Sequence, residues 1–141
     1  MRFQGFDHVD LRVPSLAAVE SFYDALLRRL GLTQKKYSFV DAHGDWHAAT
    51  AEAYNTVEWV EETDGAALPA FFGVIEEQDV APSHSRVAFR VREEELDGWV
   101  TALHEIGARE VQRNEEESYP AIFFTDPLGT RLEVVARRPS R

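Results

Sequence analysis

Five ionisable residues stand at alternate positions of short apolar segments: His8, Asp10, Arg86, Arg131 and Glu133. Imidazole and carboxylate groups can bind a metal ion or transfer a proton, and a guanidinium group can hold an anion. The segment "RLEVV" places Glu133 inside an apolar run, where an unpaired carboxylate would be costly to bury. We therefore expect Glu133 to face a polar surface rather than a dry core.

Strand periodicity brings these five residues to one side of the chain. Residues two apart in a strand share a face, so the apolar residues of "HVDLRV" and "RVAFRV" point away from His8, Asp10 and Arg86. By the same alternation, the leucine and the first valine of "RLEVV" oppose Arg131 and Glu133. We predict that one face of the strands packs on helices and that the other forms the floor of a water-accessible cleft.

An amphipathic helix is expected after the first strand of each half. Residues 15–30 carry an apolar stripe at helical spacing, begin after Pro14 and end at Gly31. Residues 92–106 carry a second stripe, which ends at Gly107. Three further strand-like segments follow each helix, so the order of elements repeats.

This repeat predicts an α+β protein with two βαβββ modules, which form a curved mixed sheet around a cleft. Module one covers about residues 1–78, the polar segment at about 79–84 is the linker, and module two covers about 85–141. Each module is too small to bury its own sheet face well, so residues 1–141 are expected to form a single domain. The open sheet edges are compatible with a homodimer.

Composition narrows the classes of partner. The net charge of −10 disfavours nucleic acid as a ligand, and the absence of cysteine excludes disulfides and thiolate metal sites. No apolar run approaches the roughly 18 residues of a membrane span, so no membrane partner is expected. The N-terminus passes directly into a strand-like pattern without a secretory signal, so the expected location is cytoplasmic.

Three segments resemble the vicinal oxygen chelate superfamily: "DHVDLRVPSLAAVESFYDALLRRLGL" at residues 7–32, "RVAFRV" at residues 86–91 and "YPAIFFTDPLGTRLEVV" at residues 119–135. This superfamily includes glyoxalase I, extradiol dioxygenases, fosfomycin-resistance transferases and bleomycin-binding proteins. The closing segment is similar to the family's aromatic-aromatic-Asp-Pro-x-Gly turn with a glutamate in the strand that follows. Because the fold hosts many chemistries, the resemblance implies a fold and a small-molecule cleft but no single reaction.

The resemblance also implies a divalent metal ion, such as Mn, Fe, Ni or Zn, in the cleft. Its ligands would be His8, the residue at the position of Arg86, and Glu133, with a fourth near Gly73. Arginine stays protonated and has no lone pair to offer, so Arg86 cannot be a ligand. His84 could be a displaced third ligand only if a shift or bulge moved it closer. We favour a metal-free cleft in which Arg86 pairs with Glu133 and His8 hydrogen-bonds to one of them.

Aromatic side chains could form the walls above this polar floor. Taken singly, each is more often a core residue than a ligand contact, but an apolar wall with a few polar groups is typical of a small-molecule site. In the superfamily that this sequence resembles, the residue equivalent to Tyr119 often borders the cleft. The expected substrate-binding residues are Arg86, Asp10, Tyr119, Phe123, Trp59 and Phe72.

Three functions fit these residues. The preferred one is a glyoxalase/bleomycin-resistance/dioxygenase-family protein with a degenerate metal site, which binds a small organic molecule and clamps its carboxylate or phenolate with Arg86. The first alternative is a metal-dependent lyase, isomerase or ring-cleaving dioxygenase that uses His8, Glu133 and a displaced third ligand. The second is a metal-free proton-transfer enzyme in which Glu133 or His8 is the base and Arg86 stabilises the anion.

Overall fold

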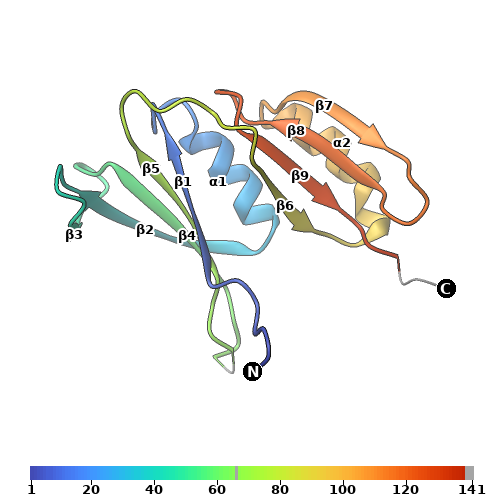
Figure 1. Cartoon of the computed structure of the whole chain (residues 1–141), viewed down its shortest axis with the longest axis horizontal. Helices are drawn as coiled ribbons and strands as arrows, with labels where there is room; N and C mark the ends of the chain where they lie inside the picture. Colours follow the sequence, from blue (N-terminus) through green and yellow to red (C-terminus); the bar gives the residue numbers. More distant parts are fainter. Residues whose placement is uncertain (66, 139–141) are drawn as a thin grey trace. The chain divides into compact units, whose positions relative to one another are not determined.

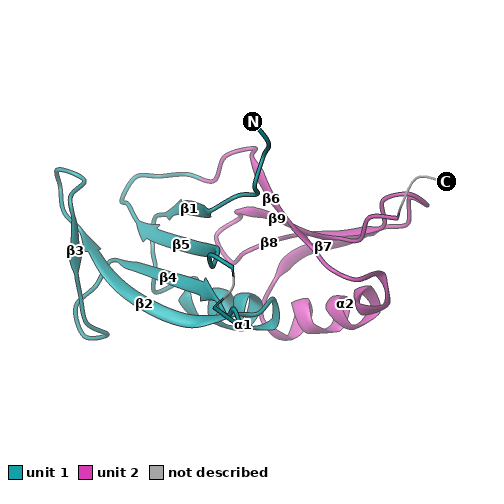
Figure 2. Cartoon of the chain, turned by 90° about the horizontal axis from the view of Figure 1, so that it is seen from below, with its two compact units in different colours: residues 1–81 teal, residues 82–141 magenta. Residues whose placement is uncertain are grey.

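The computed structural model describes residues 1–65 and 67–138, which form two compact units (Figures 1 and 2). Unit 1 is Met1–Ala81 and unit 2 is Pro82–Arg141. The boundary falls inside the segment predicted as a linker, while the single-domain organisation stays a prediction.

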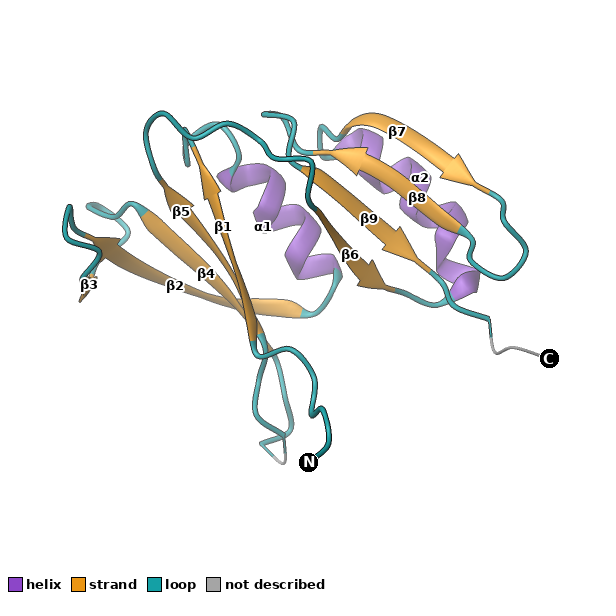
Figure 3. Ribbon diagram, in the orientation of Figure 1, coloured by secondary structure: helices purple, strands orange, loops and turns teal. Residues whose placement is uncertain are grey.

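Unit 1 is one helix against a five-stranded mixed sheet (Figure 3). The sheet order is β1-β5-β4-β2-β3, in which β1 and β5 are parallel and the other pairs are antiparallel. The elements are β1 (His8–Val13), α1 (Glu20–Arg29), β2 (Leu32–Val40), β3 (Trp46–Ala48), β4 (Thr56–Glu61) and β5 (Phe71–Glu76).

Unit 2 repeats this plan with four strands in the order β6-β9-β8-β7. Again the first and last strands of the unit are parallel neighbours, and the other pairs are antiparallel. The elements are β6 (Arg86–Arg90), a 3₁₀ turn (Glu93–Glu95), α2 (Leu96–Glu105), β7 (Arg109–Asn114), β8 (Ala121–Thr125) and β9 (Arg131–Val135). The prediction of an α+β fold from two βαβββ-type modules with mixed sheets is therefore confirmed.

Each helix forms because its apolar stripe is buried on its own sheet. Helix α1 contacts β2 and β4, and helix α2 contacts β7 and β8. The buried residues of α1 are Phe22, Tyr23, Leu26 and Leu27, and those of α2 are Leu96, Trp99, Ala102 and Leu103. Glycines with φ of +88° at Gly31 and +89° at Gly107 follow the two helices, a backbone that side-chain-bearing residues rarely adopt.

Strand register makes the two units directly comparable. Asp10 pairs with Gly73 across β1 and β5, and Ala88 pairs with Glu133 across β6 and β9. Gly73 therefore occupies in unit 1 the register position that Glu133 occupies in unit 2. The side chain that unit 2 places at this position has no counterpart in unit 1.

Two local features differ from the sequence-based expectation. Helix α1 begins at Glu20, because residues 17–19 form a turn, and in this segment the backbone N–H of Leu16 donates to Oε2 of Glu76 at 2.8 Å. Three strands were expected after the first helix, and the structure adds a fourth, the short strand β3 (Trp46–Ala48), on the edge of β2. Among the described residues, no helix is long and apolar enough to cross a membrane.

Candidate functional site

An open depression of about 500 Å³ lies on the sheet of unit 2. Its lining comes from all four strands and from the bulge in β7: Arg86, Glu110, Val111, Gln112, Phe123, Phe124, Thr125 and Arg131. One register row of the sheet contains Arg86, Arg131 and Thr125. Two residues further along the strands, and therefore on the same face, Phe123 lies beside Glu133. The depression is therefore built on the face that alternation predicted to be polar.

Two arginines stand side by side at one end of this depression. Arg86 and Arg131 are direct register partners on the parallel strands β6 and β9. Like charges directly opposite each other on neighbouring strands destabilise a sheet. Among the described residues, neither guanidinium has a hydrogen bond or an ion pair with a carboxylate. Their N–H donors are therefore available to an anion from solution.

Phe123 fixes the position of one of these arginines. The guanidinium carbon of Arg86 lies 4.5 Å from the centroid of the Phe123 ring, a distance typical of a cation–π contact. Stacking on a ring uses the face of the guanidinium and leaves the donors in its plane unused. The structure thus replaces the expected ion pair between Arg86 and Glu133 with a contact between Arg86 and an aromatic ring.

Glu133 is more buried than expected for a residue on a water-accessible floor. It is only 5% exposed, and its Oε1 atom has no hydrogen-bond partner among the described residues. Burial raises the pKa of Glu133 above its ordinary value, and the positive charge of Arg86 opposes this effect without cancelling it. An unpaired buried carboxyl oxygen is rare in proteins and is a sign of a functional group.

The opposite end of the depression is shaped by a bulge in β7. The register shifts between Arg109 and Gln112, and Glu110 adopts a φ of 51°, which is unusual for a residue with a side chain. Bulges re-aim side chains beside functional sites. This one puts Glu110 and Gln112 on the rim, which the plain alternation of "REVQRN" did not predict.

Unit 1 carries its own group of polar residues around the start of β1. The Nδ1 atom of His8 lies 2.8 Å from Asp7 Oδ2, its Nε2 lies 3.7 Å from Asp10 Oδ2, and its ring stacks on Phe71 at 4.4 Å. The hydrogen bond with Asp7 raises the pKa of His8 above 6.5. Burial raises the pKa of Glu58, which faces Gly73 across β4 and β5.

The residues expected to hold a metal ion do not form a cluster within either unit. His84 is exposed and lies in the connection before β6, so the strand extension that could have carried it toward Glu133 does not exist. Within each unit, the described His, Asp and Glu side chains form no group of three that could hold a metal ion. With arginine at position 86, the donor set of unit 2 does not fit a metal centre.

Three aromatic residues predicted to line the site lie elsewhere. Trp59 and Phe72 are register partners on the helix side of the sheet of unit 1, where they are 0% and 2% exposed. Both pack near Tyr23 of α1, so the expectation that they line an open pocket does not hold. Tyr119 precedes β8 and stacks under Arg137 at 4.8 Å, outside the depression. Of the four predicted aromatic residues, Phe123 lines the depression.

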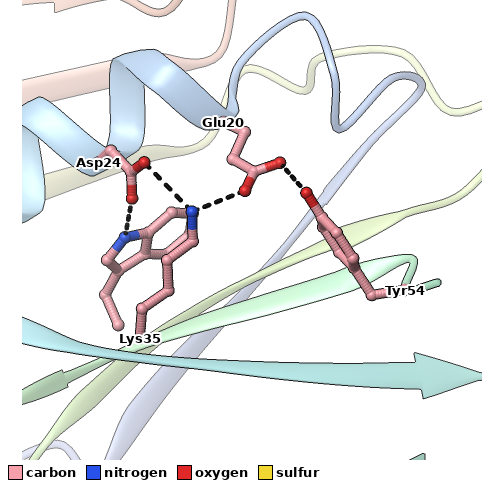
Figure 4. A network of polar contacts seen from close by, with 5 residues as sticks. Glu20, Asp24, Lys35 and Tyr54 are labelled. Carbon is pink, nitrogen blue, oxygen red and sulfur yellow. Dashed lines mark hydrogen bonds and ion pairs between the residues drawn. The ribbon is translucent and has the colours of Figure 1, made fainter. Parts of the chain in front are cut away.

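A polar network that the sequence did not reveal joins α1 to its sheet (Figure 4). Lys35 Nζ lies 2.6 Å from Glu20 Oε1 and 3.1 Å from Asp24 Oδ2. The Trp59 indole N–H donates to Asp24 at 2.8 Å, and the Tyr54 hydroxyl donates to Glu20 at 2.6 Å. The bond to Glu20 raises the pKa of Tyr54 to about 12.

Comparisons with known proteins agree with this architecture. Residues 5–134 match the family described as the Glyoxalase/Bleomycin resistance protein/Dioxygenase superfamily. The chain is 26% identical over 133 residues to the metallothiol transferase FosB of Bacillus licheniformis. The aligned region covers 92% of this chain and 73% of FosB.

Two solved structures share the fold. A glyoxalase/bleomycin resistance protein from Albidiferax ferrireducens has a TM-score of 0.64 at 20% identity, over 94% of this chain and 98% of that one. A variant of the fosfomycin resistance protein FosX from Listeria monocytogenes has a TM-score of 0.59 at 17% identity, over 97% and 95% of the two chains. That FosX structure is a complex with Mn(II) and 1S,2S-dihydroxypropylphosphonic acid.

Proposed function

This chain belongs to the Glyoxalase/Bleomycin resistance protein/Dioxygenase superfamily, and from that premise we propose that it binds a small organic anion on the sheet of unit 2. Arg86 and Arg131 hold the anionic group, and Phe123 supports the apolar body of the ligand. In this proposal binding needs no metal ion, because an arginine cation stands where the family resemblance implies a metal ligand.

The observation that carries the proposal is the adjacent pair Arg86 and Arg131 at an open depression of about 500 Å³. In the described part of the chain, neither arginine has a carboxylate partner. A carboxylate or phosphonate offers two or more oxygens to such a pair, and charge-assisted hydrogen bonds of this kind are the strong ones. An anion between the two side chains would also remove the repulsion between them. The bound phosphonate of the Listeria FosX variant is a precedent for an anionic ligand in a protein of this fold.

Thermal shift and calorimetry with benzoate and with 1S,2S-dihydroxypropylphosphonic acid test this proposal. We expect binding to wild type and at least a tenfold weaker affinity in Arg86→Ala, because each hydrogen bond to a charged group contributes about 1.5–3 kcal/mol. Arg90→Ala is the matched control, since Arg90 is exposed on the same strand but outside the depression. Equal affinities in wild type and Arg86→Ala would contradict the proposal.

A metal-dependent lyase, isomerase or dioxygenase would need His8, Glu133 and a third ligand. Among the described residues of unit 2, no His, Asp or Glu side chains form a group of three that would supply that third ligand beside Glu133, so no catalytic step through a metal follows. Titration with Mn(II), Fe(II), Ni(II) and Zn(II), followed by elemental analysis of wild type, His8→Ala and Glu133→Ala, tests this directly. One tightly bound ion per chain, lost in both variants, would favour the metal enzyme over the binder.

Proton transfer is the second candidate, and the burial of Glu133 favours it. A carboxyl group whose pKa is raised by burial can act as a general base closer to neutral pH. Glu133 would take a proton from carbon beside a carbonyl, and Arg86 would stabilise the enolate that forms. Deuterium incorporation into phenylpyruvate in D₂O, followed by NMR, tests this: catalysed exchange should be lost in Glu133→Gln, and exchange at the buffer rate in wild type would refute it.

Homodimerisation also stays a proposal. Strands β1 and β6 are edge strands of their sheets as described, and exposed edges favour pairing with another chain. Light scattering after size exclusion measures the mass in solution, and a mass of 16.0 kDa at micromolar concentration would refute a stable dimer.

A further inference from the structure

We propose that the ligand of unit 2 is amphoteric: its anionic group lies between Arg86 and Arg131, and a primary ammonium group at its other end lies against Glu110 and Gln112. This inference rests on the proposed function, because it concerns the same depression and adds the chemistry of the second end. It names a class of ligand, the elongated amino acids with a planar or apolar spacer.

The charges of the depression are separated along the sheet. The strand order β6-β9-β8-β7 puts the two guanidinium groups on β6 and β9, at one edge, and Glu110 and Gln112 on β7, at the other. Phe123 and Thr125 of β8 lie between the two ends. The lining is thus cationic, then apolar with one hydroxyl, then anionic. A ligand that matches it carries the opposite order of charges.

Sheet geometry limits the length of this ligand. Strands are about 4.8 Å apart, so three intervals separate the backbones of β6 and β7 by about 14 Å. Side chains as long as those of arginine and glutamate can extend over the depression from both ends, which shortens the span between their charged groups. An aromatic ring with substituents at opposite positions fits this span and can rest against the Phe123 ring, as aromatic pairs do.

The carboxylate of Glu110 is the group that distinguishes an amphoteric ligand from a simple anion. The Glu110 side chain has no hydrogen bond or ion pair with another described residue, and its backbone has a positive φ of 51°. Residues held in sparsely populated conformations cluster at functional sites, where the surrounding structure maintains them. A simple anion would gain nothing from a carboxylate on the rim, whereas an ammonium group would pair with it.

Two carboxylates that differ only at the second end test the proposal. Calorimetry at pH 7 measures the dissociation constants of 4-(aminomethyl)benzoate and 4-methylbenzoate for wild type, Glu110→Gln and the control Glu105→Gln. Glu105 ends helix α2, is exposed and lies outside the depression, so its substitution matches the change in net charge. We expect wild type and Glu105→Gln to bind the amino compound about three- to fivefold more tightly, as a partly exposed ion pair allows. In Glu110→Gln the ratio should approach one.

The outcomes separate this inference from the proposed function. If both compounds bind wild type equally and both are lost in Arg86→Ala, the anion site stands and the amphoteric ligand is refuted. If the amino compound is preferred but Glu110→Gln retains that preference, the assignment of its ammonium group to Glu110 is wrong. If neither carboxylate binds wild type at millimolar concentration, the anion site fails, and the inference fails with it.

Discussion

Lys35 is the residue whose loss should reveal how helix α1 is attached to its sheet. Its ammonium group lies between Glu20 and Asp24, and the side chains of these three residues are 15%, 19% and 34% exposed. Burial alone would lower the pKa of Lys35, but hydrogen bonds with Glu20 and Asp24 raise it above its ordinary value. Lys35→Met keeps the apolar stem and removes only the charge.

The expected cost follows from the two hydrogen bonds, of 2.6 Å and 3.1 Å, that the ammonium group donates. Hydrogen bonds to charged groups contribute about 1.5–3 kcal/mol each, which gives an upper limit of about 6 kcal/mol. Solvent screening of the partly exposed carboxylates and the desolvation cost of the ammonium group both reduce this value. Each carboxylate also keeps one neutral donor, Tyr54 or Trp59. We therefore expect Lys35→Met to lower the free energy of unfolding by about 2 kcal/mol.

Urea unfolding followed by tryptophan fluorescence is the assay, because the Trp59 indole donates to Asp24 inside the network (Figure 4). The midpoint should fall without a change in the slope of free energy against urea. In a melt, the same loss should lower Tm by about 6 °C for a chain of this size.

Lys36→Met is the matched control, since Lys36 is the exposed neighbour of Lys35 on the other face of β2. It should change the unfolding free energy by less than about 0.5 kcal/mol. A cost of Lys35→Met no larger than that of Lys36→Met would refute the reasoning. If the network acts through its charges, Lys35→Met should also cost less in a Glu20→Gln background than in wild type.

Two further predictions concern ionisation. Burial raises the pKa of Glu133 in the folded chain above 4.5. Between about pH 4.5 and that raised value, the folded chain therefore binds more protons than the unfolded chain. The stability that the neutral carboxyl contributes is lost as the pH rises through this window. In urea titrations, the unfolding free energy of Glu133→Gln minus that of wild type should therefore increase as the pH rises. A difference that does not change with pH would contradict the burial of this carboxyl. Because the hydrogen bond that the His8 imidazole donates to Asp7 is the main cause of the raised pKa of His8, Asp7→Asn should lower that pKa more than Asp10→Asn in NMR titrations of the imidazole. The reverse order would show that Asp10 is the stronger partner.

The local elements could be predicted from the sequence because their signals are local. Alternation of polar and apolar residues placed β1, β6 and β9 within one residue of their observed ends. Apolar stripes closed by Gly31 and Gly107 placed both helices, although a turn delays the start of α1. Strand β3 was missed because three residues on a sheet edge carry too little periodicity to distinguish them from a loop.

Strand parity also predicted that Arg86 and Glu133 share a face, and the lack of a lone pair on arginine ruled out a metal ligand at position 86, because neither argument needs coordinates. The contacts of each side chain became known only from the folded structure. It placed Arg86 on Phe123 and paired it in register with Arg131. It also left Glu133 Oε1 without a partner among the residues that the structure describes and brought Glu110 to the rim through a bulge. These facts depend on which strands are neighbours and in which register, and pairing between strands far apart in the chain leaves no signal in either strand alone.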